Sequence, residues 1–311
     1  MNGKILVIDP IATNRIVLRV KLAAGHYAVT QAGSLAEARE VIAGSVPELI
    51  LCAHALPAGG PQKLMAHMRK AGFGGKIPVV VISGPGAAQD RQRLFAAGVE
   101  DVLEKPIDDM LLLARTRSVM RAYASASEWT LRDGTSRALG FAEPGTAFAT
   151  KQRVRLVSSD IAAVAKWHSA LTQRLNATVT VCKPDGAVIK GGRDQCPDAF
   201  ILFLHPKSAP DILGLLATIR SHAATRHSSI LVIQRDPDPR LGAQMLDMGA
   251  NDLMSFDHDT AELALRLETL MSRKRMSDAL RDTLRSGVEA AVIDPLTGLH
   301  NRRYAIPHLA R

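Results

Sequence analysis

The chain has few aromatic side chains, few cysteines and no long apolar run. Aromatic residues make up only 4% of its 311 residues, and no zinc-finger, helix-turn-helix or RNA-binding sheet signature is present, so we expect no nucleic-acid partner. The three cysteines lack metal or redox spacing, which argues against a disulfide framework and against a zinc site. No stretch approaches the roughly 20 apolar residues of a membrane helix, and Asp9 interrupts the first apolar stretch too early for a secretory signal. We therefore expect a cytoplasmic protein that does not bind a membrane.

The formal net charge of +9 is concentrated in two segments. Residues 115–155 contain eight Lys or Arg against three acids, residues 273–311 contain eight against four, and the rest of the chain contains 23 of each. Both basic segments connect more apolar regions, so a solvated or domain-docking surface is favoured over a phosphate-binding one. Hydrophobic residues make up 47% of the chain, enough to bury sizeable cores.

Four segments of the sequence occur twice, about 150 residues apart. The segments at 5–8, 46–51, 77–82 and 97–101 correspond to those at 154–157, 196–201, 228–233 and 248–252. In each copy, short continuous apolar runs rich in β-branched residues alternate with stretches whose apolar residues have helical spacing. Continuous apolar runs indicate strands that are covered on both faces. The pattern predicts an α/β fold with two doubly wound parallel sheets in tandem, and functional groups at the carboxyl ends of the strands.

The strand ends of the first copy carry a recognisable set of residues. They are Asp9-Pro10, Ala53-His54, Ser83-Gly84 and Lys105-Pro106. Over residues 3–120 this set resembles the receiver domains of bacterial response regulators, which have a flavodoxin-like (CheY-like) sheet of five strands. The resemblance implies two acids after the first strand, a phosphate-accepting aspartate after the third, a serine or threonine after the fourth and a lysine after the fifth.

The first copy lacks the groups that receiver phosphorylation requires. Phosphoryl transfer needs a nucleophilic carboxylate and a divalent cation on several oxygen ligands. Here the second acid is Pro10 and the acceptor is Ala53, so Asp9 alone makes at most a weak magnesium site and Lys105 is interpreted as structural. We do not expect His54 to replace the acceptor, because its side chain points to the opposite face of the strand from residue 53.

The second copy has lost more of the strand-end residues that receiver domains carry. The corresponding positions are Ser158, Ser159, Phe203, Gln234 and Phe256. We expect the two phenylalanines to fill the cleft and exclude a cation. The second copy is therefore interpreted as a pseudo-receiver that serves docking, not chemistry.

A helical pattern begins near Thr260 and continues for about thirty residues, which is roughly 45 Å of helix. Two interpretations stay open, a helix that covers the second sheet and a signalling helix. Its heptads are imperfect, so a tight coiled coil is not expected. The segment that follows, D-P-L-T-G-L-H-N-R-R-Y, resembles the D-x-L-T-G-L-x-N-R-R opening of GGDEF diguanylate cyclase domains. The matching residues are Asp294, Leu296, Thr297, Gly298, Leu299, Asn301, Arg302 and Arg303.

The order of these parts is similar, over the whole chain, to the PleD-like response regulators, in which two receiver domains precede a GGDEF domain. The resemblance divides the chain into receiver 1 (1–120), a linker (121–150), receiver 2 (151–270), a signalling helix (271–293) and a truncated GGDEF opening (294–311). It implies the regulatory and dimerising region of a diguanylate cyclase in cyclic di-GMP signalling, which forms a homodimer through its receivers. Pro10 and Ala53 depart from the family's phosphorylated receivers, so we expect regulation independent of phosphorylation.

No G-G-[D/E]-E-F string occurs, so we expect the chain itself to be inactive and to hold no cofactor. GTP and magnesium are implied only for the missing cyclase domain. Two alternatives remain. One is a stand-alone pseudo-receiver adaptor that binds a signalling partner. The other is a conventional phosphorylated regulator, which would take up acetyl phosphate at the first copy.

Overall fold

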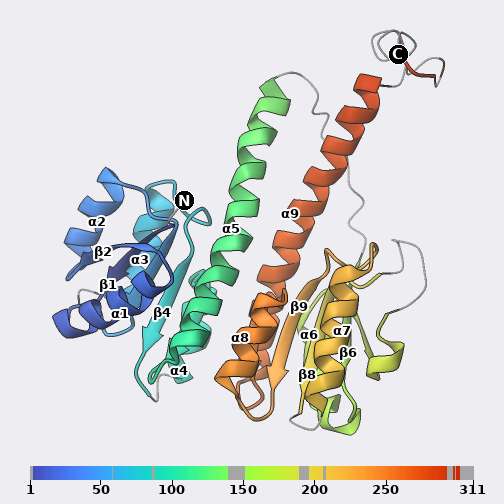
Figure 1. The fold of residues 1–311 in the computed structure, drawn as a ribbon, viewed down its shortest axis with the longest axis horizontal. Coiled ribbons are helices and arrows are strands. Elements are labelled where there is room, and N and C mark those ends of the chain that lie inside the picture. Colours follow the sequence, from blue (N-terminus) through green and yellow to red (C-terminus); the bar gives the residue numbers. More distant parts are fainter. Residues whose placement is uncertain are drawn as a thin grey trace. The chain divides into compact units, whose positions relative to one another are not determined.

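The computed structural model describes residues 3–57, 59–85, 88–138, 151–188, 196–205, 208–292, 297 and 299–301. Figure 1 shows the helices and strands of the chain, which divides into two units. The first unit is formed by residues 1–124 and 151–271 and holds both sheets, and the second is formed by residues 125–150 and 272–311.

Receiver 1 is a five-stranded parallel sheet in the order β2-β1-β3-β4-β5. Its strands are β1 (Lys4–Ile8), β2 (Ala28–Ala32), β3 (Leu49–Ala53), β4 (Val79–Ser83) and β5 (Asp101–Glu104). Its helices are α1 (Ala12–Ala24), α2 (Leu35–Gly44), α3 (Gly60–Lys70), α4 (Ala88–Ala96) and α5 (Asp109–Ala138). Side chains of α2, α3 and α4 pack on one face of the sheet and those of α1 and α5 on the other.

Receiver 2 repeats this topology, with the parallel order β10-β9-β8-β6-β7. Its strands are β6 (Gln152–Val157), β7 (Ala177–Cys182), β8 (Ala199–Leu204), β9 (Ser229–Gln234) and β10 (Asp252–Ser255). Its helices are α6 (Ala165–Arg174), α7 (Ala209–Ser221), α8 (Pro239–Asp247) and α9 (Thr260–Val292), with 3-10 turns η1 (Ala162–Val164) and η2 (Pro184–Gly186). The predicted fold class, two tandem flavodoxin-like sheets and a long C-terminal helix, is therefore confirmed.

The apolar strand sequences explain why both faces of each sheet are covered. All five residues of β3 are buried. Leu49 and Leu51 pack into the core under α1 and α5, whereas Ile50 and Cys52 pack into the core under α2, α3 and α4. Successive strand residues point to opposite faces, so a continuous apolar run serves two cores. Each fully buried aliphatic side chain contributes about 1.5–3 kcal/mol.

Glycine marks the same turn in both receivers. Gly98 follows α4 with φ of 92°, and Gly249 follows α8 with φ of 109°. This left-handed backbone ends the helix and is strained for any residue with a Cβ. A Cβ added to Gly249 would also lie only 3.0 Å from Nε of Arg220. The repeated glycine thus sets where β5 and β10 begin.

The second unit holds the outer part of each long helix. α5 continues to Ala138, so the segment assigned to the linker from residue 121 begins as helix. Within α9, Asp278 contacts Lys274 at 2.5 Å and Arg281 at 2.7 Å. These i,i+4 and i,i+3 pairs each stabilise an exposed helix by about 0.2–0.5 kcal/mol. Among the described residues, no helix combines the length and the hydropathy needed to span a bilayer.

Candidate functional site

In receiver 1, Asp9 is buried at the carboxyl end of β1, and both of its carboxylate oxygens are engaged. The backbone N–H of Ile11 donates to Oδ1 at 2.8 Å, and Nδ2 of Asn14 donates to Oδ2 at 3.0 Å. The carboxylate therefore holds the entry into α1. A magnesium ion needs several oxygen ligands, but Pro10 and Ala53 supply no side-chain oxygen. The residues present do not fit a magnesium ion, and within the described ranges no group of three or more His, Cys, Asp or Glu is arranged for a metal.

The other strand-end residues of receiver 1 keep their positions without a phosphate acceptor. Ala53 is the last residue of β3 and is 8% exposed, and its methyl group is inert. Ser83 is buried at the end of β4, where its hydroxyl donates to the carbonyl of Leu103 at 3.4 Å. The N–H of Lys105 donates to the carbonyl of Ser83 at 2.9 Å. Nε2 of His54 lies 3.4 Å from a carboxylate oxygen of Asp90 on α4, so its ring is directed to that helix.

Receiver 2 repeats the main-chain arrangement with different side chains. The N–H of Phe256 donates to the carbonyl of Gln234 at 2.8 Å, which is the counterpart of the Lys105–Ser83 bond. Phe203 pairs with Ile233 in the ladder, as Ala53 pairs with Ile82 in receiver 1. The structure thus places two aromatic rings at the acceptor and lysine positions.

The two serines of receiver 2 stand at the end of β6. The hydroxyl of Ser158 is buried, donates to the carbonyl of Asp160 at 2.8 Å and accepts from the N–H of Asp160 at 3.1 Å. Ser159 is exposed. Ser158 therefore shapes the turn into η1.

The phenylalanines do not fill this cleft, so that expectation is wrong. A cavity of ≈ 430 Å³ remains at the strand ends, with Phe203 and Phe256 among the residues that line it. The reason is the position of Trp167, whose ring centroid lies 6.0 Å from that of Phe203 and 5.7 Å from that of Phe256. The rings pack against this buried tryptophan on α6 and leave the opening free.

The two receivers meet through a buried cluster of opposite charges, here called the arginine–carboxylate cluster. It consists of Arg91, Arg115, Arg266, Asp101, Asp252 and Glu262. Arg266 contacts Asp101 at 2.9 Å and Asp252 at 2.6 Å, and Arg115 contacts the same two carboxylates. Each aspartate thus binds an arginine of its own receiver and one of the other.

The contact between the receivers pairs equivalent residues of the two repeats. Asp101 and Asp252 are 151 residues apart, as are Arg115 and Arg266, so the pairs are counterparts in the repeat. Sequence reasoning aligned the two aspartates but missed the arginines. The same offset at two identical arginines was the signal that could have found them. A self-complementary contact of this kind is what a symmetric dimer uses, but here it joins two halves of one chain.

One half of the cluster carries an additional ion pair. Nε and Nη2 of Arg91 on α4 each donate to a carboxylate oxygen of Glu262 on α9, both at 2.9 Å. The counterparts of these residues are Gly242 and Leu111, where a Cβ added to the glycine would lie 3.5 Å from Cδ1 of the leucine. The contact between the receivers therefore has an ion pair at Arg91 and Glu262 and an apolar contact at the counterpart positions, Gly242 and Leu111.

Burial and charge act in opposite directions on the acids of the cluster. Burial raises the pKa of Asp101, but the arginines around it outweigh burial and hold the pKa below its ordinary value. Desolvation raises the pKa of Glu262, but contacts with His258 and Arg91 and the charge of Arg266 outweigh it and hold the pKa below its ordinary value. Both acids stay ionised at neutral pH, beside the three arginines of the cluster.

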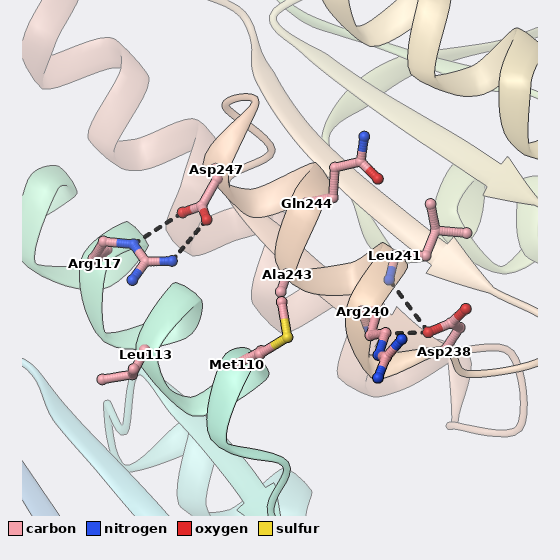
Figure 2. A pocket seen from close by; sticks show the side chains of 9 residues that line it. All are labelled: Met110, Leu113, Arg117, Asp238, Arg240, Leu241, Ala243, Gln244 and Asp247. Carbon is pink, nitrogen blue, oxygen red and sulfur yellow. Dashed lines mark hydrogen bonds and ion pairs between the residues drawn. The ribbon is translucent and has the colours of Figure 1, made fainter. Parts of the chain in front are cut away.

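A groove of ≈ 550 Å³ runs along the seam between α5 and α8 (Figure 2). Met110 and Leu113 line it from α5, and Leu241 lines it from α8. At one end, Arg117 and Asp247 form a two-point pair with distances of 3.0 and 2.6 Å. Both side chains are more than a third exposed, so this pair contributes little to stability.

Part of the GGDEF-opening motif belongs to the described residues. The N–H of Leu299 donates to the hydroxyl of Thr297 at 3.4 Å, and the N–H of Asn301 donates to the carbonyl of Val292 at 2.8 Å. The rest of the motif lies outside the described residues, namely Asp294, Leu296, Gly298, Arg302 and Arg303.

Comparisons with known proteins point to one class of signalling protein. The response regulator receiver domain family matches residues 5–117. Response regulator PleD of Caulobacter vibrioides is 33% identical to this chain over 306 residues, which cover 98% of the chain and 66% of PleD. The phosphate regulon transcriptional regulatory protein PhoB of Escherichia coli is 29% identical over 121 residues, which cover 39% of the chain and 53% of PhoB. A solved putative response regulator from Chloroflexus aurantiacus is 24% identical with a TM-score of 0.37, covering 39% of this chain and 99% of that one.

Proposed function

Because the chain belongs to the response regulators of the PleD type, we propose that it is the regulatory and dimerising region of a diguanylate cyclase that acts in cyclic di-GMP signalling in the cytoplasm. Its receivers act without phosphorylation. The GGDEF-opening motif from Asp294 supports the link to a cyclase domain. A cyclase domain of this kind would bind GTP and magnesium.

The observation that carries this proposal is the strand-end geometry of receiver 1. Ala53 stands where a receiver carries its phosphate-accepting carboxylate, and the carboxylate of Asp9 is committed to Ile11 and Asn14. An acyl phosphate cannot form on a methyl group. The missing carboxylate supports regulation through the arrangement and association of the receivers.

The arginine–carboxylate cluster supports a fixed arrangement of the two receivers. Arg266, Asp101 and Glu262 are each at most 3% exposed at the side chain. Removing one partner of a buried ion pair leaves an uncompensated charge and costs about 3–5 kcal/mol. This cost supports a role in which the two receivers act together and present their remaining surfaces to partners.

We place self-association on α1, since the α4, β5 and α5 surface of receiver 1 is already engaged with receiver 2. Ile16, Val17 and Val20 on α1 are 50%, 46% and 61% exposed, and their spacing places them on one face of the helix. A second copy of the chain would cover this apolar face. Pairing of two copies would bring two cyclase domains together and raise their effective concentration.

The test is exposure of the purified chain to acetyl phosphate with magnesium, followed by intact mass measurement. No stoichiometric hydroxylamine-labile adduct is expected on the chain, whereas a P10D/A53D variant regains the missing carboxylates and serves as the reactive comparison. An adduct on the unmodified chain would establish a conventional phosphorylated regulator instead. Sedimentation of the chain then separates the two remaining functions, because a self-dimer supports the cyclase region and a strict monomer supports a stand-alone adaptor.

A further inference from the structure

The cavity of receiver 2 has the position and size of a small-molecule site. It lies at the carboxyl ends of β8, β9 and β10, the edge at which open α/β sheets bind ligands. Its volume is ≈ 430 Å³, and ligand pockets usually enclose about 300–1,000 Å³.

The floor of the cavity is aromatic and rigid. Phe203 and Phe256 line it, with ring centroids 6.5 Å apart and an interplanar angle of 75°. Trp167 is fully buried and supports both rings in edge-to-face and tilted contacts. Preorganised rings of this kind offer a planar aromatic ligand contact area without loss of side-chain freedom.

Two cations flank the aromatic floor. Nζ of Lys166 lies 4.7 Å from the ring centroid of Phe256, and Cζ of Arg235 lies 5.8 Å from the same centroid. Within the described part of the chain, neither cation forms an ion pair. Both side chains are exposed, and Nζ of Lys166 also lies 5.4 Å from the ring centroid of Trp167.

Two acids, Asp160 and Asp211, also line the cavity. Oδ1 of Asp160 accepts from the N–H of Ala163 at 3.1 Å, which caps η1. Asp211 lies in the first turn of α7, where the positive end of the helix dipole favours a carboxylate. The carboxylate of Asp160 is thus partly engaged by backbone, whereas Arg235 lines the cavity without an ion pair among the described residues.

We propose that this cavity binds a small planar aromatic anion. The ring of the ligand packs on Phe203 and Phe256, and its carboxylate is held by Arg235 and Lys166. Receiver 2 then senses a metabolite at the place where other receivers hold a phosphoryl group. This site does not depend on the presence of a cyclase domain or on the dimer.

Isothermal titration of the full chain tests the proposal with three probes, namely benzoate, 4-hydroxybenzoate and indole-3-acetate. Indole-3-ethanol and tryptamine serve as neutral and cationic analogues of the third. At least one of the acids is expected to bind saturably at one site per chain, and at least tenfold more tightly than its neutral or cationic analogue. Absence of binding by all three acids at millimolar concentration, or equal binding of the neutral analogue, would overturn the proposal.

Single-residue variants locate the site. Arg235→Gln is expected to weaken binding of the acid about tenfold, the loss of one charge-assisted contact, and Phe256→Leu to weaken it by a similar factor. Arg174→Gln, at an exposed arginine at the end of α6, is the matched control and keeps the affinity unchanged. Thermal unfolding verifies that each variant is folded. If folded R235Q and F256L bind the acid as tightly as the unmodified chain, the ligand lies elsewhere and the assignment fails.

Discussion

The guanidinium of Arg266 on α9 donates to the carboxylate of Asp101 on β5 at 2.9 Å, although the two residues are 165 positions apart in the sequence. The same arginine binds Asp252 of its own receiver at 2.6 Å. One buried side chain therefore forms ion pairs with carboxylates of both receivers. The stability of the chain should depend strongly on it.

Replacing Arg266 with alanine leaves Asp101 and Asp252 with less compensation in a buried site. We expect the free energy of unfolding to fall by about 3–5 kcal/mol, as for other broken buried ion pairs. Urea denaturation followed by circular dichroism measures it. Arg174→Ala, at an exposed arginine, should change stability by no more than about 0.5 kcal/mol. Equal effects of the two variants would show that the cluster does not join the receivers.

The cluster predicts loss of stability in acid. Asp101 and Glu262 have lowered pKa values in the folded chain, so their contribution is complete above the unfolded values of about 3.9 and 4.3 and is lost progressively as the pH falls below them. Denaturation between pH 6 and pH 2.5 should show the fall beginning near pH 4. In Glu262→Gln the dependence on pH should be shallower, and an unchanged slope would contradict the assignment.

Substitution by alanine should change the stability of the chain in opposite directions at Gly249 and Gly214. Gly249 has φ of 109° and a close neighbour in Arg220, so Gly249→Ala should destabilise the chain by about 1–3 kcal/mol. Gly214 lies within α7 with nothing within 4 Å of an added Cβ, so Gly214→Ala should stabilise by about 0.5–1 kcal/mol. Melting temperatures of both variants provide the comparison, and a shift in the same direction would be inconsistent with the turn geometry.

A charge on the exposed face of α1 should separate two copies of the chain. Val20 is 61% exposed, so Val20→Glu should leave the monomer folded and raise the dimer dissociation constant at least tenfold in sedimentation velocity. Val46, which is 51% exposed outside α1, supplies the control Val46→Glu. If V46E dissociates the dimer and V20E does not, the interface lies on another surface.

The strands and their order could be predicted because buried strands appear in the sequence as continuous apolar runs, as in Leu49–Ala53. The residues at the strand ends could be predicted from the points where these runs end. The arginine–carboxylate cluster was harder to predict, because an arginine on a helix normally indicates solvent exposure, and only the offset shared by Arg115 and Arg266 distinguishes them from surface residues. The cavity of receiver 2 could not be predicted, since residue size alone suggested that Phe203 and Phe256 would fill it. Their packing against Trp167 is a tertiary effect.

Sedimentation velocity of the chain with and without beryllofluoride and magnesium is the sharpest test of phosphorylation-independent regulation. We expect identical sedimentation profiles, because Ala53 offers no carboxylate to the phosphate mimic and the carboxylate of Asp9 is already engaged. A saturable shift in the sedimentation coefficient on addition of beryllofluoride would show that receiver 1 still responds to a phosphoryl group, and would contradict that expectation.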